Sequence, residues 1–186
     1  MFTEAIVRAI PETFDAGIAS ANLGKPGCDK AREQHDRYIG ALERCGLKVT
    51  MLGADERHPD SVCIEDTAIV TDRCAIVTNS GADSRKGEVL EVLEVEKELS
   101  GHYENVERIL SSGTLDGGDV LQMGNHFCVG RTWRTNREAA EQLPRSCRDI
   151  IPAFHSWGCA GSCTSRRGYA TWEATNCSWP ENWWRK

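Results

Sequence analysis

Apolar residues recur along the first 143 positions at spacings that predict short strands alternating with helices. Residues 5–8 predict a short strand that Pro11 closes, and residues 47–52 alternate between apolar and polar as a strand does. Between these strands, residues 29–44 predict a helix that stops at Gly46. Its apolar face holds Ala31, His35, Tyr38, Ile39, Leu42 and Cys45. The chain is therefore predicted to begin with a strand, a helix and a second strand.

The middle of the chain predicts a hairpin, a helix and a strand. Turn residues separate the two hairpin strands, and a loop at 81–85 precedes the helix. The strands and the helix are predicted at 68–70, 74–78, 87–99 and 106–110. The same order then returns after an acidic loop at 114–119, with a second hairpin, an arginine and a helix. These elements are predicted at 120–123, 126–129, Arg134 and 136–143.

The repeated unit consists of an acidic loop, a hairpin, an arginine, a helix and a strand. It begins at Asp60 and again near Asp116. Internal repetition on this scale predicts a pseudo-symmetric α/β fold of the propeller kind. An ordinary parallel sheet is disfavoured because hairpins alternate with the helices. Two repeats, a leading part-unit and an interrupted third do not close a ring, so we expect a partial α/β-propeller.

The sequence changes character after Leu143. Residues 144–186 contain no Leu, Val or Met, and they hold five of the six tryptophans. A packed domain needs aliphatic residues at a regular period, which this stretch lacks. We therefore expect one domain at 1–143 and a poorly ordered tail at 144–186.

Length and composition narrow the class of protein. The 186 residues suffice for one soluble domain of ordinary composition, with a net charge of −6. There is no apolar run long enough for a membrane span, and the start of the chain does not resemble a secretory signal. Nine cysteines are an odd number, which disfavours a complete disulfide framework. We therefore expect a cytoplasmic protein that binds no membrane.

Two groups of acids and two arginines are the main candidates for chemistry. The acids follow predicted strands: Asp60, Glu65 and Asp66 in one repeat, then Asp116 and Asp119 in the next. Carboxylates match the fixed donors of a guanidinium, while Arg85 and Arg134 suit a carboxylate. Together they predict a pocket for an amino acid with a guanidinium side chain. Spacing alone still favours the simpler alternative, in which these residues are solvated surface charges that cap turns.

Metal and nucleic-acid sites are weaker alternatives. The acidic loops do not match the spacing of an EF-hand, so calcium is disfavoured. The cysteines of the tail, with His155, lack the paired spacing of a zinc site. The tail tryptophans with Arg166 and Arg167 could suit a nucleic acid, but the acidic front of the chain opposes that. No metal, no cofactor and no nucleic acid is therefore predicted.

An ordered series of short motifs carries a resemblance to a known family. The series includes Asn22-Leu23-Gly24-Lys25-Pro26, Pro59-Asp60-Ser61-Val62, Ile64-Glu65-Asp66, Ser84-Arg85-Lys86 with Glu88, Thr114-Leu115-Asp116-Gly117-Gly118-Asp119-Val120, and Arg134-Thr135-Asn136. With these motifs, residues 1–143 resemble the dimethylarginine dimethylaminohydrolases of the guanidine-modifying pentein superfamily, whose fold is an α/β-propeller.

The resemblance implies hydrolysis of N-methylated arginine to citrulline and an amine. A cysteine thiolate would attack the guanidinium carbon, and a histidine would help water to hydrolyse the covalent thiouronium. Carried over to this chain, Asp66 and Asp116 would hold the guanidinium, with Asp116 assigned to the catalytic group. The remaining substrate-binding positions would be Asp60 and the Ile18 backbone for the α-amino group, Arg85 and Arg134 for the α-carboxylate, and Glu65 in the pocket wall. A small-molecule substrate is thus the expected partner, and a homodimer stays open.

The resemblance ends near Leu143, before the family's histidine and cysteine. If codons begin at the third base of each present codon, residues 162–168 can encode Leu-His-Leu-Lys-Thr-Gly, which matches the family's histidine motif. A shifted reading frame near Leu143 is our interpretation, and the chain as written is expected to be inactive. Cys63 replaces an aromatic residue common in the family, and we expect it to be a small packed residue instead of a nucleophile.

Three alternatives remain open from the sequence. The parent enzyme could act on arginine itself, as an arginine deiminase or an amidinotransferase does. The chain could bind arginine-like ligands without catalysis. It could also fail to fold stably, because an open ring leaves sheet edges uncovered.

Overall fold

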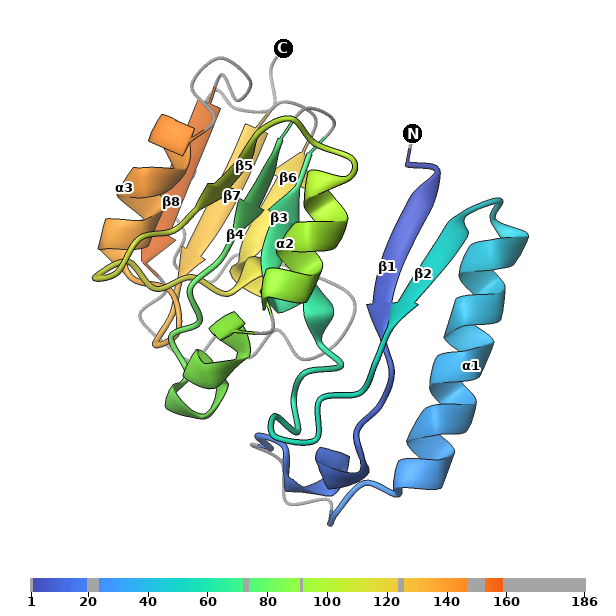
Figure 1. The fold of residues 1–186 in the computed structure, drawn as a ribbon. Coiled ribbons are helices and arrows are strands. Elements are labelled where there is room, and N and C mark those ends of the chain that lie inside the picture. Colours follow the sequence, from blue (N-terminus) through green and yellow to red (C-terminus); the bar gives the residue numbers. More distant parts are fainter. Residues whose placement is uncertain are drawn as a thin grey trace.

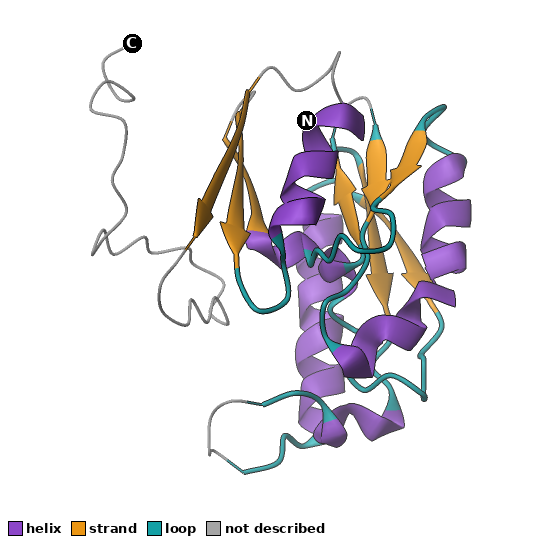
Figure 2. Ribbon diagram, turned by 90° about the vertical axis from the view of Figure 1, so that its left-hand side faces the viewer, coloured by secondary structure: helices purple, strands orange, loops and turns teal. Residues whose placement is uncertain are grey.

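The computed structural model describes residues 2–19, 24–71, 74–90, 92–123, 126–146 and 153–158. Their strands form three small sheets: one of two strands and two of three strands. Figure 1 shows the two-stranded sheet to one side of the two three-stranded sheets, and Figure 2 shows helices between and beside the strand layers. The described residues thus form a mixed α/β structure of separate sheets, as the repeated pattern predicts.

The first sheet joins β1 (Glu4–Arg8) and β2 (Lys48–Leu52) in parallel, with Glu4 opposite Lys48. The 3₁₀ turn η1 (Glu12–Ala16) and helix α1 (Cys28–Arg44) connect the two strands. Gly46 ends the helix at a φ of +85°, a value that favours glycine, and Leu47 then donates its N–H to the Leu42 carbonyl. The predicted strand, helix, strand and stop are all confirmed.

The predicted apolar face of α1 is only partly correct. No residue of α1 is buried, and Tyr38 keeps 55% of its surface exposed, as Cys45 also remains exposed. Ala31, His35, Ile39 and Leu42 are half-buried. A sheet of two strands is narrow, so it covers the middle of this face and leaves its margins in solvent.

The second sheet follows the predicted hairpin. After the 3₁₀ turn η2 (Ile64–Asp66), β3 (Ala68–Val70) pairs antiparallel with β4 (Ala75–Val77). The chain then passes through η3 (Asp83–Leu90) and α2 (Val92–Ser100), and β5 (Val106–Arg108) returns parallel to β4. The hairpin, the helix and the strand are confirmed in this order.

The boundary of the second helix differs from its prediction. Residues 83–90 form a 3₁₀ segment, where the sequence predicts a loop at 81–85 and a helix from 87. Three residues complete one turn of a 3₁₀ helix, so side chains three positions apart lie on the same side. Arg85 and Glu88 are three positions apart, and both are buried and paired with each other within this segment.

The third sheet repeats the second. The 3₁₀ turn η4 (Gly117–Asp119) leads into β6 (Val120–Met123), which pairs antiparallel with β7 (His126–Arg131). Helix α3 (Arg137–Ser146) follows, and β8 (Ala153–Gly158) pairs parallel with β7. The predicted hairpin and helix of the second repeat are confirmed, and the strand β8 completes the same unit.

Two described segments lie beyond residue 143, within the range 144–186 where the sequence predicts a poorly ordered tail. Helix α3 continues to Ser146, and residues 153–158 form a strand on the free edge of β7. The absence of Leu, Val and Met misleads here because aromatic residues such as Phe154 and Trp157 also favour strands. Residues 159–186 lie outside the described residues, and so do the zinc, nucleic-acid and reading-frame hypotheses that concern them.

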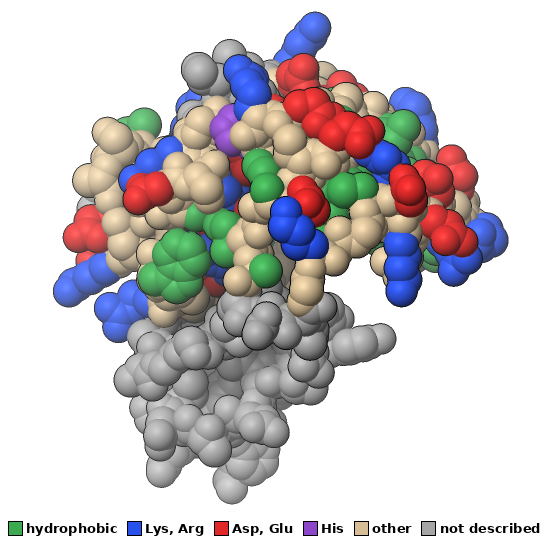
Figure 3. Space-filling view, turned by 90° about the horizontal axis from the view of Figure 1, so that it is seen from below, with side chains coloured by type: hydrophobic (Ala, Val, Ile, Leu, Met, Phe, Trp, Pro, Cys, Tyr) green, Lys and Arg blue, Asp and Glu red, His purple; other side chains and the backbone are tan. Residues whose placement is uncertain are grey.

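Two apolar clusters hold the sheets together. One joins the second and third sheets with α3, and its buried members include Ile76, Leu115, Phe127, Val129 and Leu143. The other joins α2 to both the first and the second sheet through Val95 and Leu99. Acidic and basic side chains are interspersed over the described part of the face in Figure 3. None of the described helices combines the length and apolarity required to cross a membrane.

Candidate active site

Two glycines bring the acidic turns η2 and η4 into direct contact. A Cβ on Gly117 would lie 2.1 Å from the Glu65 carbonyl oxygen, and one on Gly118 would lie 2.6 Å from an Asp66 carboxylate oxygen. Without side chains here, the Gly118 N–H donates to Asp66 Oδ1 at 2.9 Å. The Gly-Gly pair of the second acidic loop thus lets two successive repeats place their carboxylates together.

Arg85 is buried between two carboxylates. Its Nε donates to Glu88 Oε1 and Oε2 at 2.9 and 3.1 Å, and its Nη2 donates to Glu88 Oε2 at 2.8 Å. The Nη1 group donates to Asp66 Oδ2, and Nη2 also reaches the Cys63 carbonyl oxygen at 3.2 Å. These pairs raise the pKa of Arg85 further above its ordinary value, against the opposing effect of burial. Arg85 is therefore a permanent cation with acids on two sides.

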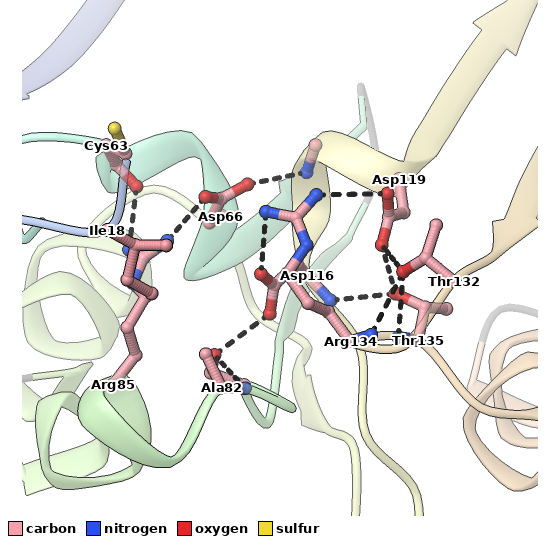
Figure 4. A network of polar contacts seen from close by, with 12 residues as sticks. Ile18, Cys63, Asp66, Ala82, Arg85, Asp116, Asp119, Thr132, Arg134 and Thr135 are labelled. Carbon is pink, nitrogen blue, oxygen red and sulfur yellow. Dashed lines mark hydrogen bonds and ion pairs between the residues drawn. The ribbon is translucent and has the colours of Figure 1, made fainter. Parts of the chain in front are cut away.

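Arg134 has a similar but looser environment. Its Nη1 lies 3.3 Å from Asp116 Oδ2, and its Nη2 lies 3.3 Å from Asp119 Oδ1. Asp119 also accepts hydrogen bonds from the Thr132 and Thr135 hydroxyls, at 2.8 and 2.6 Å. Figure 4 shows the Asp66 and Asp116 side chains between Arg85 and Arg134.

Asp116 is the least satisfied carboxylate of the network. Its residue surface is 0% exposed, and Ser80 donates its hydroxyl to Oδ1 at 2.9 Å. Oδ2 is buried and accepts no hydrogen bond of good geometry, although Arg134 lies nearby. Burial, and then the negative charge of Asp66, raise the pKa of Asp116 above its ordinary value. A cation that reached Oδ2 would relieve both effects.

Asp60 and Ile18 form a separate contact between the first loop and the start of the second unit. The Ile18 N–H donates to both Asp60 oxygens, at 3.1 and 2.9 Å. Glu65 keeps an exposed surface, but the atoms packed around its carboxyl displace water and thereby raise its pKa. A backbone hydrogen bond opposes this shift in pKa. The structure thus places Ile18, Asp60 and Glu65 on segments that adjoin the paired acids and arginines.

Cys63 does not have the properties of a nucleophile. Burial raises the pKa of its thiol to about 12, and the neighbouring Glu65 and Asp66 charges add to the shift. The reactive form of cysteine is the thiolate, which such a pKa disfavours at neutral pH. Figure 4 shows the Cys63 sulfur pointing away from Asp66.

The structure gathers the predicted residues but pairs them differently from the expectation. From the sequence, the acids are predicted to bind one end of a ligand and the arginines the other end. In the described structure, each arginine instead contacts an acid directly. What these residues do toward a ligand stays a prediction. Sequence reasoning placed Glu88 and Thr135 in motifs of the resemblance without giving either a role at the site, and it did not single out Thr132. The Glu88 position, three residues after Arg85, was a usable signal for their pairing.

Two curated proteins that share one name match most of this chain in sequence. The chain is 45% identical over 145 residues to N(G),N(G)-dimethylarginine dimethylaminohydrolase of Pseudomonas aeruginosa, covering 77% of this chain and 56% of that protein. It is 39% identical over 136 residues to the Streptomyces coelicolor protein of the same name, covering 73% of this chain and 52% of that protein. No family model matches the chain.

A solved structure of a protein from the same family is also similar to this chain. The Pseudomonas aeruginosa protein, as a cysteine-to-serine mutant complexed with citrulline, superposes with a TM-score of 0.81 at 39% identity. That match covers 87% of this chain and 63% of that one. This chain carries a dimethylarginine dimethylaminohydrolase-like portion. It spans about half the length of the curated dimethylarginine dimethylaminohydrolases (DDAHs) that it matches.

More distant neighbours extend the fold comparison only. The N-terminal domain of ArgZ, an arginine dihydrolase of cyanobacteria, has a TM-score of 0.67 at 16% identity, covering 82% of this chain and 56% of that one. A likeness at this identity shows that the DDAH-like portion shares the pentein fold. It carries no information about a ligand of this chain.

Proposed function

We propose that the described residues hold the substrate of a DDAH-type guanidine hydrolase, and that this substrate is an N-methylated arginine. The observation that carries the proposal is Asp116 Oδ2, a buried carboxylate oxygen without a hydrogen bond, beside the carboxylate of Asp66. A guanidinium offers several planar N–H donors to such a pair. Support also comes from the relatives' names and from the citrulline bound to a solved relative.

Charge favours the same ligand. Asp66, Glu88, Asp116 and Asp119 surround two arginines in this network, so carboxylates outnumber fixed cations. The surplus negative charge attracts one further cation. A ligand guanidinium would meet Asp66 and Asp116, and the ligand's carboxylate would lie toward Arg85 and Arg134.

The other end of the amino acid has a proposed place as well. Asp60 and the backbone of Ile18 would receive the α-amino group, and Glu65 would stand in the wall of the pocket. In the described structure, Asp60 already accepts the Ile18 N–H, which fixes the loop against the start of the second unit. An ammonium at this place would share the Asp60 carboxylate.

The proposed reaction proceeds through a covalent intermediate. A thiolate attacks the guanidinium carbon, the protonated dimethylamine leaves, and water then hydrolyses the thiouronium to give citrulline and regenerate the thiol. Asp66 and Asp116 would hold the guanidinium in its charged form, which makes its carbon electrophilic. Because Cys63 is unsuited to the attack and the resemblance assigns the attack to none of the other described cysteines, the proposal gives the described residues a binding role and this chain no nucleophile.

Calorimetry with dimethylarginine tests the proposal. We expect saturable binding to the unsubstituted chain and a loss of affinity of about 100-fold in Asp116→Asn, because a charged hydrogen-bonded pair contributes about 1.5–3 kcal/mol. Asp83→Asn is the matched control, since Asp83 is an exposed acid paired with Lys86 on η3. A folded chain that takes up no dimethylarginine would refute the proposal.

The expectation that this chain does not turn over its substrate also remains to be tested. Citrulline formation during incubation with dimethylarginine would contradict it, and binding without citrulline would agree with it. A cytoplasmic location stays part of the proposal, supported by the five described cysteines that are free thiols. A homodimer is likewise still a hypothesis, which sedimentation of the purified chain would test.

A further inference from the structure

Each arginine of the site contacts one acid near the proposed ligand and one acid behind it. Arg85 lies between Asp66 and Glu88, and Arg134 lies between Asp116 and Asp119. Asp66 and Asp116 are the acids proposed to receive a guanidinium. The acid behind each arginine has no assigned function in the proposal above.

Glu88 holds one edge of the Arg85 guanidinium. Its carboxylate accepts both Nε and Nη2, while Nη1 is directed to Asp66. Both side chains are almost completely buried, with exposed fractions of 5% for Arg85 and 6% for Glu88. A bidentate contact of this kind fixes the orientation of the guanidinium plane as well as its charge.

A bound guanidinium would change the partners available to Arg85. In the described structure Asp66 is paired with Arg85, so a ligand guanidinium must share or displace that pair. A buried cation left without a partner is strongly unfavourable. If Glu88 did not exist, Asp66 could turn to a ligand only by leaving Arg85 uncompensated until a ligand carboxylate arrived.

We propose that Glu88 is a positioning residue that keeps Arg85 paired and oriented while Asp66 exchanges Arg85 for the guanidinium of a ligand. The inference rests on the proposed function of the site. Arg85 Nη1, freed from Asp66, then faces the ligand's carboxylate without any movement of the Nε edge. Glu88 does not touch the ligand and acts through Arg85 alone.

The second arginine supports this reading independently. Asp119 has the corresponding place behind Arg134, and the Thr132 and Thr135 hydroxyls hold it there. The two rear acids come from different places in the repeat: Glu88 lies three residues after its arginine, whereas Asp119 lies three residues after Asp116. The shared feature is thus an arginine between a ligand-facing acid and a rear acid, whichever segment supplies the latter.

Glu88→Gln, compared with the unsubstituted chain, tests the inference through two ligands that differ in one group. Arginine has a carboxylate that can compensate Arg85, while agmatine has the same guanidinium and amine without it. NMR titration should show that the substitution weakens agmatine by about 10- to 100-fold and arginine by about threefold. A general disturbance of the fold would weaken both ligands by the same factor. Asp83→Asn, an exposed acid on the same 3₁₀ segment, should change neither.

The outcomes separate this inference from the proposed function. Equal losses for the two ligands, or losses below about twofold, would overturn the role of Glu88, while dimethylarginine binding to the unsubstituted chain preserves the proposed function. If the unsubstituted chain bound neither dimethylarginine nor arginine, both would be overturned.

A second measurement needs no substitution, in case Glu88→Gln does not fold. On saturation of the unsubstituted chain with arginine, the Arg85 Nε–H should keep its slow solvent exchange, because Glu88 still accepts it. Fast exchange of the Nε–H in the complex would overturn the inference.

Discussion

Arg85 and Arg134 occupy equivalent places in two successive repeats, yet their surroundings differ. Arg85 has 5% of its side chain exposed and donates to Glu88, Asp66 and the Cys63 carbonyl. Arg134 has 19% exposed, and both of its ion pairs measure 3.3 Å. The exposed ring of Trp133 lies 5.9 Å from the Arg134 guanidinium carbon. One repeat thus holds its arginine in a buried, closely paired position, whereas the next leaves its arginine more exposed with longer contacts. We propose that this difference lets Arg134 adjust to a ligand more readily than Arg85.

Replacement of each arginine by methionine should separate the two environments most strongly. Arg85→Met leaves the buried Glu88 and Asp66 uncompensated, so the free energy of unfolding should fall by about 3–5 kcal/mol. Arg134→Met removes longer and more exposed contacts, and about 1 kcal/mol should be lost. Urea unfolding at neutral pH measures both, and equal losses would contradict the difference between the repeats.

Gly117→Ala should push the two repeats apart. Its Cβ would lie 2.1 Å from the Glu65 carbonyl oxygen, a backbone atom that cannot move aside alone. We expect a loss of about 1–3 kcal/mol in unfolding free energy together with weaker ligand binding. Gly53→Ala is the control, because a Cβ there meets nothing within 4 Å. If the two alanine variants behaved alike in thermal unfolding, the contact between η2 and η4 would not matter.

Asp116→Asn should raise stability at neutral pH, by a smaller amount than the losses above. The pKa of Asp116 is raised from 3.8 in the folded protein, so its charged form is disfavoured there. The contribution of this group to stability is fully present at low pH and declines as the pH rises from about 3.8 through the folded pKa. The asparagine variant lacks this decline, so its advantage should grow over that window. An advantage that instead shrank as the pH rose would contradict the assignment.

Trp133→Ala should have the smallest effect. A cation–π contact at an exposed site contributes about 0.5–1 kcal/mol. We expect a change in unfolding free energy near the low end of that range, with a modest loss of ligand affinity through Arg134. Tyr38→Ala is the control, because it removes an exposed aromatic ring from α1, and it should leave the ligand affinity unchanged. Equal effects of the two substitutions on affinity would show that Trp133 does not support Arg134.

The order of elements could be predicted because their signals are local. The hairpins follow from apolar runs separated by turn residues, and α1 ends at Gly46 as its sequence indicates. The 3₁₀ segment at 83–90 was not predicted this way, and its Arg85 pairs with Asp66, 19 residues away, a contact that no local pattern includes. The strand at 153–158 was missed because its residues pair with β7, a partner that a composition test does not consider.

The residues of the site could be predicted from the sequence, but the contacts between them could not. The acids and arginines were identified by type and by their equivalent positions in the repeats. Their mutual pairing was not, because Asp66 meets Gly118 from 52 residues away and Arg85 from 19. Patterns of neighbouring residues in the sequence do not reveal contacts over such separations. The reading-frame hypothesis and the boundary at Leu143 remain predictions, and sequencing of the DNA through that codon would test them.

A crystal structure of the chain with an N-methylated arginine would test the central claim most directly. The account predicts the ligand guanidinium on Asp66 and Asp116, its carboxylate on Arg85 and Arg134, and both arginines still held by Glu88 and Asp119. A ligand bound elsewhere, or one bound while both arginines keep their pairs with Asp66 and Asp116, would contradict it.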